Sequence, residues 1–385
     1  MKLIERSIAD ALSFHNGKAA TLDESGEFEV FGSNGKIGFS KENNHERAII
    51  LGRVGAYCGS VMLSQNKFWA TDNTIVLKAK NLQSLRYWFY RLGNFPIRSF
   101  AGGAAQPLMT HSILNGINIK IHSDFNVQEK IADTLASYDD LIENNRRRMA
   151  LLEDSARLLY REWFVRLRFP GYEHTPIVDG VPQGWERRTL ESVCLKGNGI
   201  QTGPFGSQLH QADYSDEGVP VVMPKDLVNF RVSVATIARI PEGLAENLGR
   251  HRMVPGDTVY GRRGDIGRRA FIGKRQRGWF CGTGSLRIRP DPQAINPLYL
   301  FDYLGTAAAV GDITNRAKGS TMLNLSAGAL KPVPVLVPSR TLQEMYAEQA
   351  GLVREMVEVL DEQNKKLRTA RDLLLPRLMS GELSV

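Results

Sequence analysis

Two long heptad runs constrain the fold of this chain more than any other feature of its sequence. In one run, seam positions recur at alternating intervals of four and three residues from Ile131 to Trp163, and in the other the same spacing continues from Tyr346 to Leu378. A seam sustained over more than about four heptads predicts a long helix that packs against another helix as a coiled coil. The stretch from Gln128 to Val165 alone would be roughly 57 Å long at about 1.5 Å per residue.

Each heptad run contains one asparagine at a seam position, Asn145 in the first run and Asn364 in the second. An antiparallel pairing that sets Ile131 opposite Leu378 places both asparagines in one layer, where their amides can bond to each other. Buried asparagines lower the stability of a coiled coil but fix its register. We therefore predict that Asn145 and Asn364 set the register of the two helices. The alternative is that each asparagine faces solvent at a frayed position.

An internal repeat organises the rest of the chain. Gly52–Gly55 matches Gly264–Gly267 at a separation of 212 residues, and Gln128 matches Gln343 at a separation of 215. Because each half runs from a strand-rich region into a heptad run, we expect an α+β chain with two mixed α/β domains, a long antiparallel two-helix coiled coil between them, and an internal pseudo-twofold repeat. The expected boundaries are a first domain at 1–126, a central helix at 127–168, a Pro- and Gly-containing linker at 169–188, a second domain at 189–339 and a C-terminal helix at 340–380.

The strand-rich regions carry recognisable turn and cap signals. Asn34-Gly35 predicts a tight hairpin between strands at 28–31 and 37–39, because Gly35 supplies the positive φ that such a turn needs. Asn296 followed by Pro297 predicts a helix start. Further strands are expected at 47–51, 73–77, 219–223, 257–260, 269–272 and 285–288, and helices at 82–92 and 297–309.

Charge gives the first indication of a partner. The 49 basic and 41 acidic residues give a net charge of +8, and the isoelectric point is near 9.3. Between Arg262 and Arg289 lie nine basic residues, opposed only by Asp265. Such a window suits a polyanionic partner, although a solvated strand-and-loop face is an equally good interpretation of the window alone.

Several protein classes are excluded by the sequence. No apolar run approaches the roughly 20 residues needed to cross a bilayer, and the N-terminus resembles no signal peptide, so we expect a soluble, cytoplasmic protein. The three cysteines are too dispersed for a disulfide framework. Gly35-Lys36 is not followed by the Ser or Thr of a nucleotide-binding loop, and the histidines have no metal-ligand spacing. We therefore expect a chain that binds without catalysing.

Several sequence blocks together resemble the specificity subunit of type I restriction–modification enzymes. The blocks of the second half are Gly203–Leu209, Val222–Leu227 and Gly261–Gly267, introduced by Pro182–Trp185. The blocks of the first half are Phe31–Gly38, Gly52–Gly59 and Phe68–Asn73, and the ending Leu374–Leu383 is also similar. The resemblance covers nearly the whole chain.

The resemblance implies a role in a larger complex. Each domain would be a target recognition domain that reads one half of a bipartite double-stranded DNA site, and the helices would set the spacing between the halves. Two methyltransferase subunits would dock on this chain and methylate an adenine in each half-site, and restriction subunits would join them. S-adenosylmethionine, ATP and Mg would belong to those partner subunits, so that this chain would hold no cofactor or metal of its own and would contact no membrane.

Residue chemistry selects candidates within the blocks. Arginine and glutamine side chains can read base edges, whereas lysine and serine mostly hold phosphate. The candidate DNA-binding residues are Asn34, Lys36, Arg53 and Tyr57 in the first domain and Ser207, Gln208, Lys225, Arg262, Arg263 and Arg268 in the second. Two other functions stay open: a coiled-coil scaffold that joins two protein partners without DNA, and a nuclease or methyltransferase fragment with a dispersed active site.

Overall fold

The chain divides into two compact units. The computed structural model describes residues 2–80, 83–103, 106–205, 208–264, 266–317 and 324–385. Unit 1 comprises Met1–Arg148 and Val359–Val385, and unit 2 comprises Met149–Glu358. The two long helices, α4 (Phe125–Tyr160) and α9 (Arg340–Met379), contribute a segment to each unit. The helix expected at 340–380 agrees with α9 to within one residue, whereas the helix expected at 127–168 extends past the end of α4 at Tyr160 and past the π-helical turn Arg161–Val165 that follows it.

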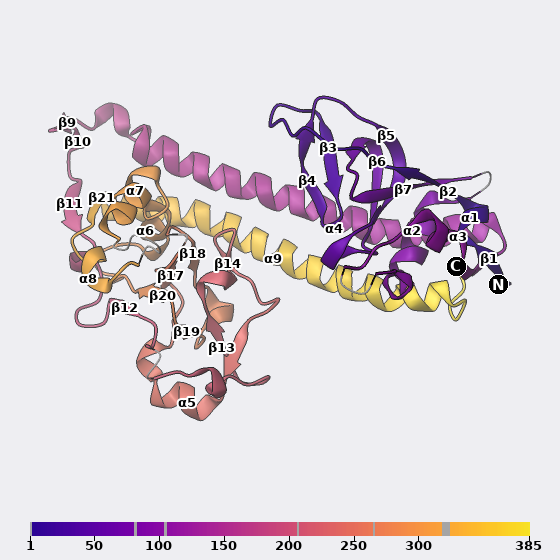
Figure 1. Ribbon diagram of the computed structural model, residues 1–385. Helices are drawn as coiled ribbons and strands as arrows, with labels where there is room; N and C mark the ends of the chain where they lie inside the picture. The colour runs from indigo at the N-terminus through magenta and orange to yellow at the C-terminus, as the bar shows by residue number, and fades with distance from the viewer. Residues whose placement is uncertain (1, 81–82, 104–105, 206–207, 265, 318–323) are drawn as a thin grey trace. The chain divides into compact units, whose positions relative to one another are not determined.

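Unit 1 is built on a six-stranded sheet with the order β2-β7-β5-β6-β3-β4 (Figure 1). All neighbouring strands are antiparallel except β3 and β6, which are parallel. Its elements are β1 (Leu3–Ser7), α1 (Ile8–Ala11), β2 (Leu12–Asn16), β3 (Phe28–Gly32), β4 (Gly35–Ser40), β5 (His45–Gly52), β6 (Val61–Ala70), β7 (Thr74–Ala79), α2 (Leu85–Gly93), α3 (His111–Asn115) and β8 (Asn118–His122).

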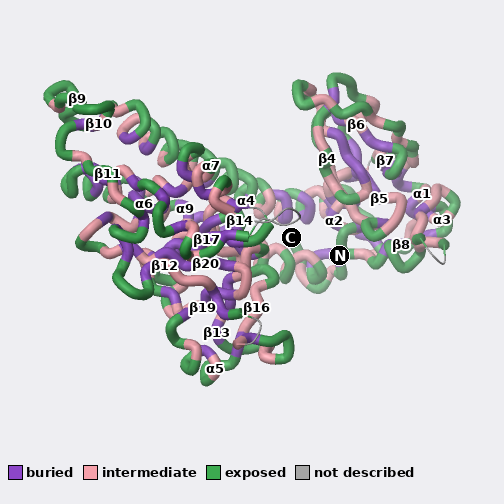
Figure 2. Tube along the Cα trace, turned by 60° about the vertical axis from the view of Figure 1, so that its left-hand side comes forward, coloured by how far each residue is buried: buried purple, intermediate pink, exposed green. Residues whose placement is uncertain are grey.

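The central strand β5 has apolar side chains on both faces of this sheet. Ile49 and Leu51 pack in a buried cluster with side chains of α2 and α4, whereas Ala48 and Ile50 pack in a second cluster on the opposite face. Successive side chains of a strand point to opposite faces, so this run of buried residues marks a strand covered on both sides (Figure 2). Both faces of the sheet are therefore buried at β5.

The hairpin predicted at Asn34-Gly35 is present between β3 and β4. Gly32 pairs with Gly35, which leaves Ser33 and Asn34 as the two turn residues. Gly35 has φ +112, a conformation that side chains other than hydrogen rarely adopt. The dipeptide signal thus located the hairpin, but the turn is shorter than the segment between the expected strands, because Gly35 is already the first residue of β4.

In unit 1 the segments of α4 and α9 pack antiparallel. Ile131 and Leu135 near the start of α4 share a buried cluster with Leu378 and Leu374 near the end of α9. Asn145 Nδ2 donates to Asn364 Oδ1 over 3.0 Å, and both side chains are buried. Asn364 Nδ2 also donates to the Ile142 carbonyl over 3.3 Å. The predicted asparagine contact is confirmed, and the frayed, solvent-facing alternative is wrong.

An arginine on α9 completes the polar contacts of this helix pair. Arg371 forms an ion pair with Asp139 of α4, and Tyr90 of α2 donates to the other oxygen of Asp139 over 2.6 Å. Burial and the neighbouring carboxylate raise the pKa of Tyr90. The phenol therefore stays a donor, and Asp139 links the sheet-bearing part of unit 1 to both helices.

Unit 2 contains several small sheets. The largest has the order β12-β20-β17-β18, and a second has the order β16-β13-β19. The strands are β9 (Ile177–Val178), β10 (Val181–Pro182), β11 (Glu186–Thr189), β12 (Ile200–Thr202), β13 (Val219–Val222), β14 (Leu227–Val228), β15 (Arg231–Val232), β16 (Ala238–Ile240), β17 (Thr258–Gly261), β18 (Arg269–Phe271), β19 (Phe280–Cys281), β20 (Ser285–Ile288) and β21 (Pro334–Val337), and the shorter helices are α5 (Glu242–Asn247), α6 (Pro297–Tyr303), α7 (Ala307–Arg316) and α8 (Ala327–Leu330).

In unit 2, α4 and α9 meet through aromatic side chains. The Trp163 and Tyr346 rings lie 6.3 Å apart between centroids, and Leu159 packs on the cluster that contains buried Ala350. Both pairs belong to the register that sets Asn145 against Asn364. The end of α4 passes into a π-helical turn, Arg161–Val165, whose Phe164 is buried.

One expected helix is two helices in the structure. The sequence predicted a single helix over 297–309, but α6 ends at Tyr303 and α7 begins at Ala307. The break occurs because Thr306 caps α7, with its hydroxyl accepting from the Ala309 N–H over 3.2 Å. The predicted Asn296 cap at the start of α6 is confirmed.

Equivalent contacts recur in the two units. β1 pairs antiparallel with β8 in unit 1, and β11 pairs antiparallel with β21 in unit 2. Gln128 Nε2 donates to the His122 carbonyl over 2.7 Å, and Gln343 Nε2 donates to the Pro338 carbonyl over 2.8 Å. Both glutamines are buried near the start of a long helix. The glutamines matched by the sequence repeat therefore each donate to a backbone carbonyl that precedes their helix.

Candidate nucleic-acid interface

In unit 1 the loops that carry the candidate residues meet at one end of the sheet. Ser60 Oγ of the β5–β6 loop donates to the Ser33 carbonyl in the β3–β4 turn over 2.5 Å. The Met109 N–H donates to the Arg53 carbonyl over 2.8 Å. A Cβ on Gly52 would lie 2.4 Å from the Tyr57 carbonyl oxygen, so glycine permits this close approach. The turn containing Asn34 and the loop containing Arg53 and Tyr57 are thus brought together.

The candidate side chains of unit 1 differ in how freely they face solvent. Tyr57 is 58% exposed, Asn34 is exposed, and Arg53 is half-buried. Lys36 Nζ donates to Glu29 Oε1 over 2.8 Å and lies 4.0 Å from the centroid of the Phe39 ring. Lys36 already has an anionic partner, so a phosphate contact by this lysine would replace its ion pair with Glu29.

In unit 2 the loops that carry the candidate residues approach one another closely at Gly203 and Gly284. A Cβ on Gly203 would lie 2.0 Å from the Gly282 carbonyl oxygen, and a Cβ on Gly284 would lie 3.3 Å from Pro224. The Arg262 N–H donates to the Gly284 carbonyl over 3.0 Å. These contacts bring the block that begins at Gly203, the block that contains Lys225 and the hairpin that contains Arg262 to one place.

Arg262 is held in place but has no acidic partner among the described residues. Its side chain is 7% exposed, and its Nη2 donates to Asn324 Oδ1 over 3.1 Å. Its guanidinium carbon lies 5.7 Å from the centroid of the Phe205 ring, and its Nε makes no hydrogen bond. Burial, reinforced by the charge of Arg263, lowers the pKa of Arg262. A desolvated, oriented cation of this kind favours an electron-rich ligand.

The remaining candidates of unit 2 have varied environments. Lys225 Nζ donates to the Thr236 carbonyl over 2.9 Å, so its ammonium is held by a backbone acceptor. Arg263 and Arg268 are exposed on the β17–β18 hairpin. Ser207 lies outside the described residues. β17 and β18, which correspond to the strands expected at 257–260 and 269–272, form an antiparallel hairpin in which Tyr260 pairs with Arg269.

Gln208 belongs to a short polar chain. Arg250 Nη2 donates to Gln208 Oε1 over 3.1 Å, and Arg250 Nε donates to His251 Nε2 over 3.1 Å. Burial, with Arg250 and Arg287 nearby, lowers the pKa of His251 to about 4. The imidazole is therefore neutral near pH 7 and can accept from Arg250, which in turn holds Gln208 in place.

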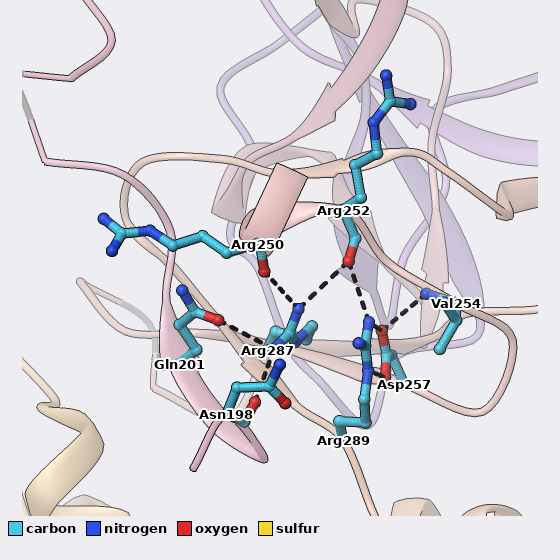
Figure 3. A network of polar contacts seen from close by, with 8 residues as sticks. All are labelled: Asn198, Gln201, Arg250, Arg252, Val254, Asp257, Arg287 and Arg289. Atoms are coloured by element: carbon cyan, nitrogen blue, oxygen red, sulfur yellow. Dashed lines mark hydrogen bonds and ion pairs between the residues drawn. The ribbon is translucent and has the colours of Figure 1, made fainter. Parts of the chain in front are cut away.

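The basic window of the sequence is only partly a surface. Arg287 is 1% exposed and donates to the carbonyls of Arg250 and Asn198 over 2.7 and 2.6 Å (Figure 3). Arg289 forms an ion pair with fully buried Asp257 over 2.7 Å. Arg269 is also buried. For these three arginines, both interpretations of the window, a surface for a polyanionic partner and a solvated face, are wrong. Their guanidinium groups point into the fold and contact carbonyl groups, a carboxylate or aromatic rings.

Sequence reasoning did not select three residues that the structure places beside the candidates. They are Phe205, 55% exposed beside Arg262, Asn324, which orients Arg262, and Arg250, which contacts Gln208. Phe205 belongs to the block Gly203–Leu209, and an aromatic residue in this glycine-containing block was the signal that could have identified it from the sequence. Asn324 and Arg250 are distant in sequence and carried none.

Neither a metal-ion site nor a membrane-spanning helix is found among the described residues. No group of three or more His, Cys, Asp or Glu side chains is placed to hold a metal ion. No helix in the part of the chain that the structure describes is long and apolar enough to cross a membrane.

Comparisons with known proteins give a consistent picture. Residues 6–154 match the family model of the type I restriction modification DNA specificity domain. The specificity subunit of the type I restriction enzyme MjaIX from Methanocaldococcus jannaschii is 24% identical over 298 residues, which cover 75% of this chain and 66% of that protein. The specificity subunit of the type I restriction enzyme HindI from Haemophilus influenzae is 22% identical over 338 residues, covering 72% of this chain and 71% of the relative.

A solved structure extends the likeness to the fold. The crystal structure of a type I restriction–modification S subunit from M. genitalium superposes with a TM-score of 0.66 at 19% identity, covering 98% of this chain and 96% of that chain. The chain thus has the mixed helix and strand fold of that subunit. The matches confirm the resemblance to type I specificity subunits that the sequence blocks indicated.

Proposed function

We propose that this chain is the DNA-sequence specificity subunit of a type I restriction–modification complex. The observation that carries the proposal is that two units supply similar loop clusters. In unit 1 the Met109 N–H donates to the Arg53 carbonyl, and in unit 2 the Leu325 N–H donates to the Arg262 carbonyl, both over 2.8 Å. In each unit the carbonyl in this contact belongs to a candidate arginine that directly follows a central strand, Arg53 after β5 and Arg262 after β17. Two such clusters suit the reading of two half-sites.

Each cluster contains the side chains that base recognition needs. In unit 2, Arg262 is oriented by Asn324 and Gln208 by Arg250, and both side-chain types can make paired hydrogen bonds to purine edges. In unit 1, Asn34, Arg53 and Tyr57 lie on adjoining loops. We assign base reading to these residues, and phosphate contacts to Arg263, Arg268, Lys225 and Lys36, with Ser207 as a further candidate.

The long helices are the proposed spacer. The seam residues and the Asn145–Asn364 layer support an antiparallel two-helix coiled coil that relates the recognition domains by a pseudo-twofold repeat. A rigid helical pair can fix the distance between two reading surfaces, and successive major-groove faces of B-DNA are about 34 Å apart. The same helices are the proposed docking platform for two methyltransferase subunits, which restriction subunits would join.

Catalysis would reside in those partners. Adenine methylation with S-adenosylmethionine, and cleavage driven by ATP and Mg, are assigned to the methyltransferase and restriction subunits. This chain would supply sequence selection alone, as a non-catalytic subunit.

Genome-wide mapping of methylated adenines is the direct test. A host that carries the chain with its methyltransferase partner should show methylation at a bipartite, asymmetric site with a fixed gap, and deletion of the chain should abolish it. Replacement of residues 189–339 by the equivalent domain of a relative should change one half-site only. Methylation that is unaffected by both changes would refute the proposal.

The open alternatives predict different results. A scaffold that joins two proteins would bind its partners without salt-dependent, sequence-selective affinity for a split DNA site. An enzyme fragment would transfer methyl groups or cut DNA as the purified chain alone. Binding measurements at several salt concentrations, with and without the methyltransferase partner, separate all three functions.

A further inference from the structure

A cavity of about 610 Å³ lies within unit 2, between the α4 and α9 segments and the connections β14–β15 and α6–α7. Sites for small organic ligands usually have volumes of about 300–1,000 Å³. Three phenylalanines line the cavity, Phe230, Phe271 and Phe301, together with the guanidinium groups of Arg269 and Arg354. None of these residues belongs to the candidate nucleic-acid interface.

The rings and guanidinium groups of this wall pack against one another in one cluster. Arg269 lies between Phe230 and Phe301, with its guanidinium carbon 4.7 and 4.9 Å from the two ring centroids. The Arg354 guanidinium carbon lies 4.5 and 5.7 Å from the centroids of Phe301 and Phe271, and these two rings meet edge to face with their centroids 5.6 Å apart. Cations stacked on aromatic faces are favourable but remain charged. The cluster therefore holds two positive charges against aromatic surfaces.

Asp302 is the acidic neighbour of both guanidinium groups but, in the described part of the chain, hydrogen-bonds to only one of them. Asp302 accepts from Arg354 Nη2 over 2.6 Å and from the Tyr346 hydroxyl over 2.7 Å. Arg269 is 8% exposed, and its side chain makes a single hydrogen bond among the described residues, from Nε to the Phe301 carbonyl over 3.2 Å. Its two terminal nitrogens have no acceptor there. The buried Nε of Arg354 also has none.

The wall is formed at some conformational cost to the backbone. Asn229 and Phe230 form the two-residue turn between β14 and β15, with φ +48 and +60. This left-handed region is unfavourable for an aromatic residue and is usually occupied by glycine or asparagine. Arg231, next in the chain, forms an ion pair with Glu153 of α4 over 3.2 Å. The turn thus presents the Phe230 ring to Arg269 while it is fastened to the helix.

We propose that this cavity binds a small organic carboxylate with a hydrophobic body. The apolar part would lie against Phe230, Phe271 and Phe301, and the carboxylate would accept from the terminal nitrogens of Arg269. A carboxylate suits this guanidinium because it can accept two parallel N–H bonds, and such charge-assisted bonds are strong in a desolvated site. The binding site does not depend on DNA recognition.

Calorimetric titration of the full chain with 4-phenylbutyrate and with its uncharged amide tests the proposal. We expect one molecule of the acid to bind per chain, and the amide to bind about tenfold more weakly or worse, because it lacks the charge-assisted bonds. Arg269→Met should remove the preference for the acid over the amide. Equal affinities of the acid and the amide for the unmodified chain would overturn the proposal. So would the absence of acid binding at about 10 mM, a concentration on the order of the dissociation constants of the weakest specific ligands.

Two glycines provide a matched pair of variants. Gly351 of α9 lines the cavity, and Gly311 of α7 does not; a Cβ at either position would meet nothing within 4 Å. Gly351→Phe should place a ring in the cavity and abolish acid binding, while Gly311→Phe should leave the affinity unchanged. Acid binding that survives Gly351→Phe would show that the ligand sits elsewhere. Arg269→Met supplies the independent readout if Gly351→Phe fails to fold.

Discussion

Arg262 and Arg287 come from the same basic window of the sequence but have opposite environments. Arg287 donates to carbonyl groups of Arg250 and Asn198 and to Gln201 Oε1, so its hydrogen-bonding capacity is used inside the fold. Arg262 has one side-chain acceptor, Asn324, and lies beside the exposed ring of Phe205. Composition alone cannot separate these roles, because the difference lies in which acceptors the fold brings to each guanidinium.

Arg262→Ala should weaken DNA binding without unfolding the protein. If Arg262 reads a base, we expect a loss of about 1–3 kcal/mol and a changed preference at one position of the site. If it holds phosphate instead, the salt slope should fall by about one unit. Fluorescence anisotropy at several salt concentrations distinguishes the two. Lys331→Ala, which removes an exposed lysine paired with Glu191, is the control, and an Arg262→Ala protein with unchanged affinity at every salt concentration would contradict the assignment.

Arg287→Met should act on stability rather than on base preference. The change leaves buried carbonyl acceptors without a donor, for which we expect a loss of about 2–4 kcal/mol in the free energy of unfolding. Urea denaturation measures this loss. A stable Arg287→Met protein with altered base preference would instead place Arg287 in the interface.

His251 should make stability depend on pH. Because burial lowers its pKa to about 4 in the folded chain, against about 6.5 when unfolded, the unfolded state binds the proton more readily. The contribution is present above pH 6.5 and is lost as the pH falls toward 4, by about 2 kcal/mol at pH 5. Urea unfolding at pH 7 and pH 5 measures it. In His251→Gln this part of the difference should vanish, and an equal pH difference in both proteins would contradict the pKa.

At the scale of elements, the heptad runs and turn signals were the most reliable guides. A strict four-three spacing predicted both long helices, because that spacing places apolar residues on one face of a helix. The expected bounds match α9 and the start of α4 but extend beyond the end of α4 at Tyr160. The hairpin between β3 and β4 was predictable from Asn34-Gly35 for a similarly local reason, although its exact turn residues, Ser33 and Asn34, were not. The break between α6 and α7 was missed because capping by Thr306 competed with the helix-favouring alanines that follow it, and local composition does not show which prevails.

The candidate site was less predictable than the elements that carry it. The blocks around Arg53 and Arg262 could be located, but their neighbours could not, since Asn324 reaches Arg262 from 62 residues along the chain. Contacts of that separation depend on how loops converge on glycines such as Gly282. They are set by tertiary packing rather than by any local pattern.

The Asn145–Asn364 layer offers a test of register. Asn145→Leu alone should destabilise the protein by about 1–3 kcal/mol, because it leaves the Asn364 amide buried without its partner. The double change with Asn364→Leu should recover most of that stability and can exceed the original, since an apolar layer packs without polar groups to satisfy. Thermal unfolding of the four proteins forms a double-mutant cycle. Additive effects of the two changes would contradict a direct contact.

For the whole molecule, the proposed spacer makes a quantitative prediction. Seven residues inserted after Arg148 and seven after Leu360 add one heptad at matched positions of the register that pairs Asn145 with Asn364, so the seam remains continuous. The helical pair should lengthen by about 10 Å, which corresponds to about three base pairs of B-DNA. Mapping of methylated adenines should then show the same two half-sites separated by a gap about three base pairs longer. Insertion into only one helix breaks the register and should abolish methylation, whereas an unchanged gap after the double insertion would mean that the helices do not measure the DNA.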